Sequence, residues 1–198
     1  MKRLLSLVVM ICITTISCKT IQAQQLKILT TENELAENVG TQVSVRGAVV
    51  HVCPVNGKIM KLQLSDGTMM QILPNSDGKR FHISEDEHLK TVTLTFPDTD
   101  TLTYKDDEWG KKQITISGKL FENRVSKQHI DSLYNAKILT CHINYEDCKD
   151  VNYQKKMTEL GKAQASLDKT NAKLYGRMQN SGKDYVVVYT LMAEKAEF

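Results

Sequence analysis

Alternating apolar and polar residues mark the first part of the chain as a series of short β-strands. Residues 58–65 alternate in this way, which is typical of a strand with one buried and one solvated face. Asn56-Gly57 precedes this run and Asp66-Gly67 follows it. Both dipeptides favour the type I′ turn of a β-hairpin, because they tolerate positive φ at both central positions. The pattern therefore predicts a meander of three strands, 41–53, 58–65 and 68–73.

Two later runs with the same period, 91–96 and 113–122, predict a fourth and a fifth strand. Between the third and fourth strands, Ser84 followed three residues later by Glu87 forms a capping box, which predicts a single helical turn. The long first strand has Gly47 in its middle, as expected of a bent strand that serves both halves of a barrel. We predict a mainly β fold with α: an OB-like five-stranded Greek-key barrel, followed by a C-terminal helical segment and a final strand.

The C-terminal part of the chain has a different pattern. Ser126 caps a predicted helix, and spacings of four and three residues over 153–178 predict a long helix with a heptad-like stripe. The stripe packs on the barrel or, in an alternative interpretation, forms the seam of a homodimer. The β-rich run 185–191 predicts a last strand that adds to a sheet.

The domain layout expected from these patterns has four parts. They are a signal peptide (1–23), an N-terminal helix and linker (24–40), the OB-like barrel (41–125), and a helical segment with a terminal strand packed on the barrel (126–198). In the second part, Thr30-Thr31 followed by early acids such as Glu32 predicts a short helix with a Thr cap.

The first residues are typical of an export signal. Lys2 and Arg3 precede an apolar run over 4–16, whose 13 residues are too few for a membrane span of about 20. Cleavage after Ala23 would release a soluble protein, and the alternative is a lipoprotein attached to the membrane through Cys18. In both cases we expect a protein exported by a bacterium to the periplasm or the cell surface.

Removal of this leader changes the charge. The chain has 26 Lys and Arg against 23 Asp and Glu, and three of the basic residues (Lys2, Arg3 and Lys19) lie in the leader. The mature chain therefore has 23 basic and 23 acidic residues. A nucleic-acid-binding protein is expected to carry a basic surplus, so this balance disfavours nucleic acid as a partner.

Cysteine usage agrees with export. The mature chain keeps Cys53, Cys141 and Cys148. Six residues separate Cys141 from Cys148, and a local disulfide between them is expected in an oxidising compartment. Cys53 is then a single thiol or, in an alternative pairing, the partner of one of the other two.

His51 and Cys53 are candidate metal ligands. Residues two apart on a strand point to the same side, and Met60 lies across the predicted Asn56-Gly57 turn. His, Cys and Met are soft ligands that suit copper in an exported protein. The alternative interpretation is structural, because Cys is among the most often buried residue types.

One group of known proteins has a similar pattern. The residues that carry the similarity are Gly47, His51, Cys53, Gly57-Lys58, Asp66-Gly67, Gly118, Leu120, Glu122, Arg124, Ser126 and Ile130. Over 41–133 the chain resembles small exported OB-like proteins of Bacteroidota. The resemblance implies an OB-like barrel and, in relatives with a second His and a second Cys near the first hairpin, a pocket for a metal such as zinc. Here those positions hold Asn56 and Met60.

Three classes of function remain at this point. The first, which we favour, is a non-enzymatic binding module of the bacterial cell envelope that takes a small ligand, glycan or peptide. The second is a protein that binds copper or zinc through His51 and Cys53. The third is an enzyme, which is disfavoured because Gly-x-Ser-x-Gly, His-Glu-x-x-His, phosphate-loop and Cys-x-x-Cys motifs do not occur in the sequence.

Overall fold

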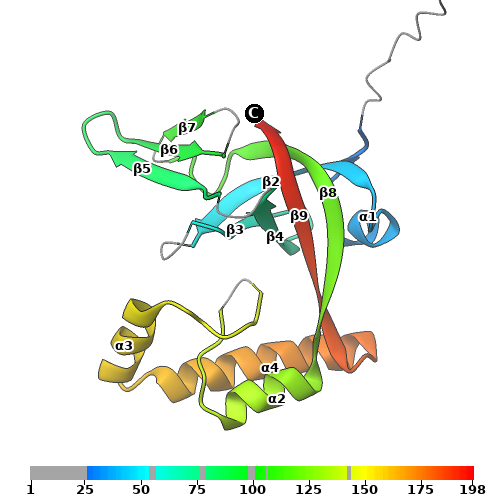
Figure 1. Cartoon of the computed structure of the whole chain (residues 1–198), viewed down its shortest axis with the longest axis vertical. Coiled ribbons are helices and arrows are strands. Elements are labelled where there is room, and N and C mark those ends of the chain that lie inside the picture. The colour runs from blue at the N-terminus through cyan, green and yellow to red at the C-terminus, as the bar shows by residue number, and fades with distance from the viewer. Residues whose placement is uncertain (1–25, 54–56, 76–78, 98–100, 106, 142–143) are drawn as a thin grey trace, which may run out of the picture.

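The structure is a computed structural model that describes residues 26–53, 57–75, 79–97, 101–105, 107–141 and 144–198. The predicted signal peptide, with Cys18, lies outside the described residues, and so does Asn56 of the first predicted turn. Figure 1 shows a β-barrel at one end of the molecule and helices at the other, joined by a long pair of strands. Within the described residues, none of the helices combines the length and the apolar character that a membrane span needs.

The predicted three-stranded meander is confirmed. It consists of β2 (Gln42–Val52), β3 (Met60–Gln63) and β4 (Met69–Pro74), paired antiparallel in chain order. The predicted type I′ turn at Asp66-Gly67 is wrong, because only Gly67 has a positive φ, of 83°, and that turn type needs two. Asp66 instead shapes the turn with its carboxylate, which accepts the N–H of Thr68 at 2.9 Å.

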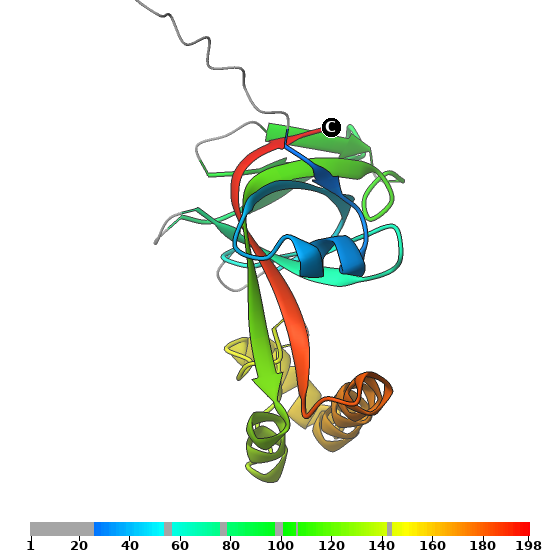
Figure 2. The same cartoon turned by 90° about the vertical axis from the view of Figure 1, so that its right-hand side faces the viewer.

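Five strands close into a barrel in the order β2-β3-β4-β9-β8, with β8 (Gln113–Ser126) pairing back onto β2 (Figure 2). The last strand, β9 (Tyr185–Glu197), lies between β4 and β8, parallel to β4 and antiparallel to β8. The terminal strand is therefore a wall of the barrel, and the barrel extends beyond the range 41–125. The short β1 (Ile28–Leu29) pairs parallel with β2.

The first helix follows β1. As predicted, α1 (Glu32–Glu37) begins with a Thr cap, in which Thr31 and Glu34 form a capping box. Leu35 on this helix is fully buried and belongs to the cluster that fills the barrel. The helix is thereby fixed to the barrel, and its first turn presents Glu32 at the surface.

A second, three-stranded sheet is inserted between β4 and β8. It contains β5 (His82–Asp86), β6 (Thr91–Thr95) and β7 (Thr101–Lys105) in antiparallel order. The helical turn predicted at Ser84–Glu87 is wrong, and the run predicted as the fourth barrel strand is instead the middle strand of this sheet. Pairing with a neighbouring strand outweighs the local capping tendency, because propensity is weak beside tertiary contacts.

Beyond the barrel, β8 and β9 continue together as a two-stranded arm that carries the helices (Figure 1). Helix α2 (Lys127–Asn135) follows β8 directly and is capped by Ser126, as predicted. It is followed by α3 (Val151–Glu159) and α4 (Ala163–Ser181), and α4 leads into β9. The arm and the helices share a core of their own, separate from that of the barrel, which includes Val125, Ile130, Leu174, Met178, Val186 and Val188.

The prediction of a single helix over 153–178 is wrong, because the helical conformation is interrupted between α3 and α4. Gly161 lies at the break with a φ of 63°, which glycine adopts without strain. Leu167, Leu174 and Met178 of the predicted stripe are buried inside the protein. The C-terminal part of the stripe therefore packs within the chain, whereas Leu160 is 52% exposed, and the homodimer seam stays a prediction.

Gly47, which was predicted as a bend, and Gly118 both lie where barrel strands approach closely. A Cβ added at Gly47 would meet the Gln63 carbonyl oxygen at 2.5 Å. One added at Gly118 would meet the Met192 carbonyl oxygen at 1.9 Å. Both contacts are with backbone atoms, so the missing side chains are what allow the strands to pass.

Candidate functional site

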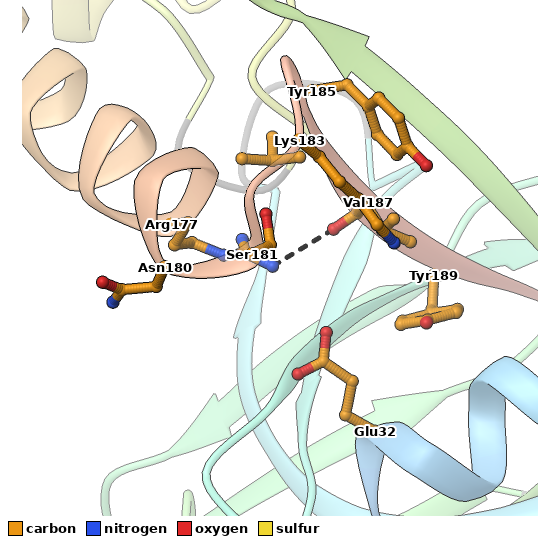
Figure 3. Close-up of a pocket in the computed structure, with 9 residues that line it drawn as sticks. Glu32, Arg177, Asn180, Ser181, Lys183, Tyr185, Val187 and Tyr189 are labelled. Carbon is orange, nitrogen blue, oxygen red and sulfur yellow. Dashed lines mark hydrogen bonds between the residues drawn. The ribbon is translucent and has the colours of Figure 1, made fainter.

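The first of two neighbouring cavities lies where α4 ends and β9 begins, opposite the first turn of α1 (Figure 3). Its volume is about 340 Å³. Arg177 and Ser181 of α4, Tyr185 and Tyr189 of β9, and Glu32 of α1 contribute to its lining. Figure 3 shows the carboxylate of Glu32 directed toward the space between α1 and the end of α4.

The second cavity, of about 270 Å³, lies between α4 and the turn that joins β3 to β4. Lys173, Tyr145 and Asp66 are among the residues that line it. Glu32 and Arg177 line both cavities, so the two adjoin. We call the two cavities together the interlayer cleft, because it separates the barrel from the helices.

The two walls of the interlayer cleft carry opposite charges. Lys173 and Arg177 are four residues apart on α4 and therefore lie on one face of the helix. Glu32 and Asp66 belong to the barrel side. Among the ion pairs of the described residues, none joins Lys173 or Arg177 to Glu32 or Asp66. The charges thus face the cleft without neutralising one another directly.

The carboxylates of Asp66 and Glu32 differ in their surroundings and hydrogen bonds. The Asp66 carboxylate accepts the N–H groups of Glu32 at 2.7 Å and of Thr68 at 2.9 Å. Burial raises the pKa of Asp66, but these backbone donors outweigh burial and leave it below its usual value. Asp66 is therefore ionised and already bonded. Glu32 lies in the first turn of α1, where the positive end of the helix dipole favours a carboxylate.

The guanidinium of Arg177 is held in place by β9, in the two-stranded arm. Its Nη2 donates to the Val187 carbonyl oxygen at 3.3 Å, as Figure 3 shows. A guanidinium has five N–H donors, so this bond leaves others for a ligand. Arg177 is half-buried, which strengthens its electrostatic interactions relative to those of a fully solvated group.

Besides burial, the opposing charges of Glu32 and Arg177 both affect the pKa of Tyr189. Burial is the main cause that raises its pKa, Glu32 raises the pKa further, and Arg177 lowers it. Both charged residues therefore act on one phenol from the two sides of the cleft. The ring of Tyr185 faces two cations, with Arg124 at 4.8 Å and Lys183 at 5.4 Å from the ring centroid.

A polar row crosses the outer face of the barrel beside the cleft. The register places His51 opposite Lys61, Lys61 opposite Gln71, and Gln71 opposite Thr190. Burial is the main cause that lowers the pKa of Lys61, and Lys173 of the cleft wall lowers it further. The row and the cleft are therefore within electrostatic reach of each other.

Gln71 and Thr190 are the buried members of this row. Gln71 is 5% exposed, and among the described residues its buried Oε1 has no hydrogen-bond donor. An unsatisfied buried acceptor is costly, by about 1–3 kcal/mol, and is uncommon in native structures. Met69, two residues earlier on the same strand, lines the cleft.

The three candidate metal ligands are not brought together. A register shift between Val49 and His51 places His51 on the outer face of the barrel, whereas Val49 stays in the core. Met60 is fully buried in the barrel core and pairs with Val52 rather than with His51. Among the described residues, no three His, Cys, Asp or Glu side chains form a group that could hold a metal ion. Copper or zinc binding through His51 and Cys53 stays a prediction.

Cys141 and Cys148 lie on the two arms of a short β-bridge. The Cys141 N–H donates to the backbone carbonyl oxygen of Glu146 at 2.7 Å, and the Cys148 N–H donates to that of Leu139 at 2.8 Å. Both thiols are free, as is that of Cys53, so the disulfide between 141 and 148 stays a prediction. Burial raises the pKa of the Cys148 thiol, and Cys141 and Cys53 add smaller contributions. Cys141 and Cys53 are thus within electrostatic reach of the Cys148 thiol, and the alternative pairing of Cys53 with one of the other two also stays a prediction.

The residues that line the interlayer cleft were not predicted from the sequence. Lys173 and Arg177 are four apart on a predicted helix, and this spacing is the one local signal of their shared face. Glu32 was predicted only as an early acid of a helix, and Tyr189 only as part of a β-rich run. Their approach depends on the placement of β9 in the barrel.

Comparisons of the chain with protein-family models, with curated proteins and with solved structures give no match. The function is therefore inferred from the geometry of the cleft.

Proposed function

We propose that the protein is a non-enzymatic, exported OB-like binding module of the bacterial cell envelope, which takes a small ligand, glycan or peptide in the interlayer cleft. The observation that carries the proposal is the cleft itself, two adjoining cavities of about 340 and 270 Å³ lined by charged and aromatic side chains. Cavities of this size, with a few convergent polar groups, are typical of small-molecule sites.

The strand arrangement supports the OB-like part of the proposal. The barrel has five strands in the order β2-β3-β4-β9-β8, with β4 and β9 parallel. OB barrels bind ligands on the face of their second and third strands and with the loops that follow their first and fourth strands. Here the corresponding parts are β3, β4 and the segment between β8 and β9, which contains α4. The interlayer cleft lies between the β3–β4 turn and α4.

The chemistry of the cleft favours binding over catalysis. Ser181 contributes a hydroxyl to the lining of the first cavity. This hydroxyl donates to the Met178 carbonyl oxygen at 3.1 Å, and not to a side chain that could activate it as a nucleophile by taking its proton. The other polar groups described above are bonded to backbone or face an opposite charge across the cleft. Such groups hold and orient a ligand.

The experiment that tests the proposal is nuclear magnetic resonance titration of the ¹⁵N-labelled protein with three probes. The probes are trialanine, triacetylchitotriose and citrate, which represent peptides, glycans and small anions. We expect saturable shifts at the amides of Arg177, Ser181 and Tyr189 with at least one probe, and recovery of that probe unchanged. Absence of shifts with all three probes, shifts confined to another surface, or conversion of the probe would each contradict the proposal.

A further inference from the structure

We infer that the ligand of the interlayer cleft is a short peptide with free ends, whose carboxylate binds Arg177 and whose ammonium group binds Glu32. This inference rests on the proposed binding function and specifies its ligand. It is carried by the two opposite charges at the junction of the cavities, which line both of them and form no ion pair with each other.

Arg177 has the geometry of a carboxylate receptor. One N–H is used by the Val187 carbonyl oxygen, which fixes the planar group against the arm. The remaining donors match the two oxygens of a carboxylate, and such bidentate pairs are the stronger class of hydrogen bond. Lys173, one turn earlier on α4, adds a second positive charge on the same wall.

Glu32 is the acid that remains for an ammonium group. Asp66 beside it is occupied by two backbone N–H donors, whereas no hydrogen bond of the described residues uses the Glu32 carboxylate. Figure 3 shows this carboxylate directed into the space opposite the end of α4. A cationic ligand group placed there would neutralise it and would also face Asp66.

Other ligand classes fit the cleft less well. A phosphate or another ligand with negative charge only would place that charge against Glu32 and Asp66, which is unfavourable in a partly desolvated site. A glycan needs open aromatic faces, but the Tyr185 ring already faces Arg124 and Lys183, and Tyr189 is 5% exposed. A zwitterion satisfies both walls at once.

The test is calorimetric titration of the purified protein with trialanine, N-acetyl-trialanine and trialanine amide. The acetyl group removes the ammonium charge, and the amide removes the carboxylate. We expect trialanine to bind and each blocked peptide to bind about tenfold more weakly, which corresponds to about 1.4 kcal/mol. Equal binding of all three peptides would contradict the inference.

Two variants assign the ends of the peptide to residues. In Glu32→Gln, trialanine and its N-acetyl form are expected to bind equally, whereas the amide stays weaker. In Arg177→Gln, trialanine and its amide are expected to bind equally. Lys155→Gln, on the exposed surface of α3, is the matched control and should behave as the wild type. Equal melting temperatures of the four proteins establish that the variants are folded.

Failure of this inference differs from failure of the proposed function. If triacetylchitotriose or citrate binds in the cleft and trialanine does not, the ligand class is wrong and the binding function stands. If no probe binds in the cleft, both are wrong. If Glu32→Gln or Arg177→Gln still discriminates between free and blocked ends as the wild type does, the assignment of those residues is wrong.

Discussion

Substitution of Gly118 by alanine tests how tightly the barrel closes. A Cβ at this position would lie 1.9 Å from the carbonyl oxygen of Met192, whereas ordinary van der Waals contact begins at 3.4 Å. The two strands would have to move apart locally by about 1.5 Å, the difference between these distances. A hydrogen bond of about 2.9 Å does not survive such a displacement, so the β8–β9 ladder would open around Gly118.

The expected cost follows from what the displacement breaks. Each lost ladder bond costs about 1 kcal/mol, and overpacking adds about 1–3 kcal/mol, so we expect Gly118→Ala to lower the free energy of unfolding by about 3 kcal/mol or more. The measurement is urea unfolding followed by circular dichroism. Gly176 provides the matched control, because it lies within α4 and a Cβ added there would meet nothing within 4 Å. Gly176→Ala should raise the free energy of unfolding by about 0.5–1 kcal/mol. An unchanged urea midpoint for Gly118→Ala would refute the close approach of the strands.

Two further predictions concern buried polar groups. The Tyr104 hydroxyl is buried and has no hydrogen-bond partner among the described residues; Tyr104→Phe should therefore leave the free energy of unfolding unchanged or raise it by about 1 kcal/mol, and a loss of that size in urea unfolding would contradict this. For His51, burial and then Lys61 lower the pKa below 6.5, so the unfolded state binds the proton more readily. The wild type should therefore lose stability as the pH falls below about 6.5, and His51→Gln should lose less, as measured by urea midpoints at pH 7.5 and 5.0.

The meander could be predicted from the sequence because its information is local. Alternation and a glycine turn determine three consecutive strands that pair in chain order. The Thr31 cap of α1 and the Ser126 cap of α2 were predicted for the same reason, since a capping side chain bonds within three residues of its own position.

The positions of β6 and β9 could not be predicted, because they depend on which strands pair with each other. The runs 91–96 and 185–191 are both alternating or β-rich, and nothing local distinguishes a barrel strand from the middle strand of an inserted sheet. The barrel takes β9, which pairs with β4 across most of the chain, and β6 pairs with its own sequence neighbours. The side of the barrel on which His51 lies could not be predicted either, because it depends on a single register shift after Val49.

The position of the cleft follows from the unequal lengths of the strands. At about 3.3 Å per residue, a strand of 14 residues such as β8 extends on the order of 45 Å, far beyond β3 with its 4 residues. The excess length of β8 and β9 carries the helices away from the barrel, and each part closes its own apolar core. The surfaces between the two cores therefore do not need apolar side chains, and they hold Glu32, Lys173 and Arg177 instead. A ligand that bonds to both walls would connect two separately packed parts of the protein, so binding should also raise the free energy of unfolding of the whole protein, as measured by urea unfolding with and without trialanine.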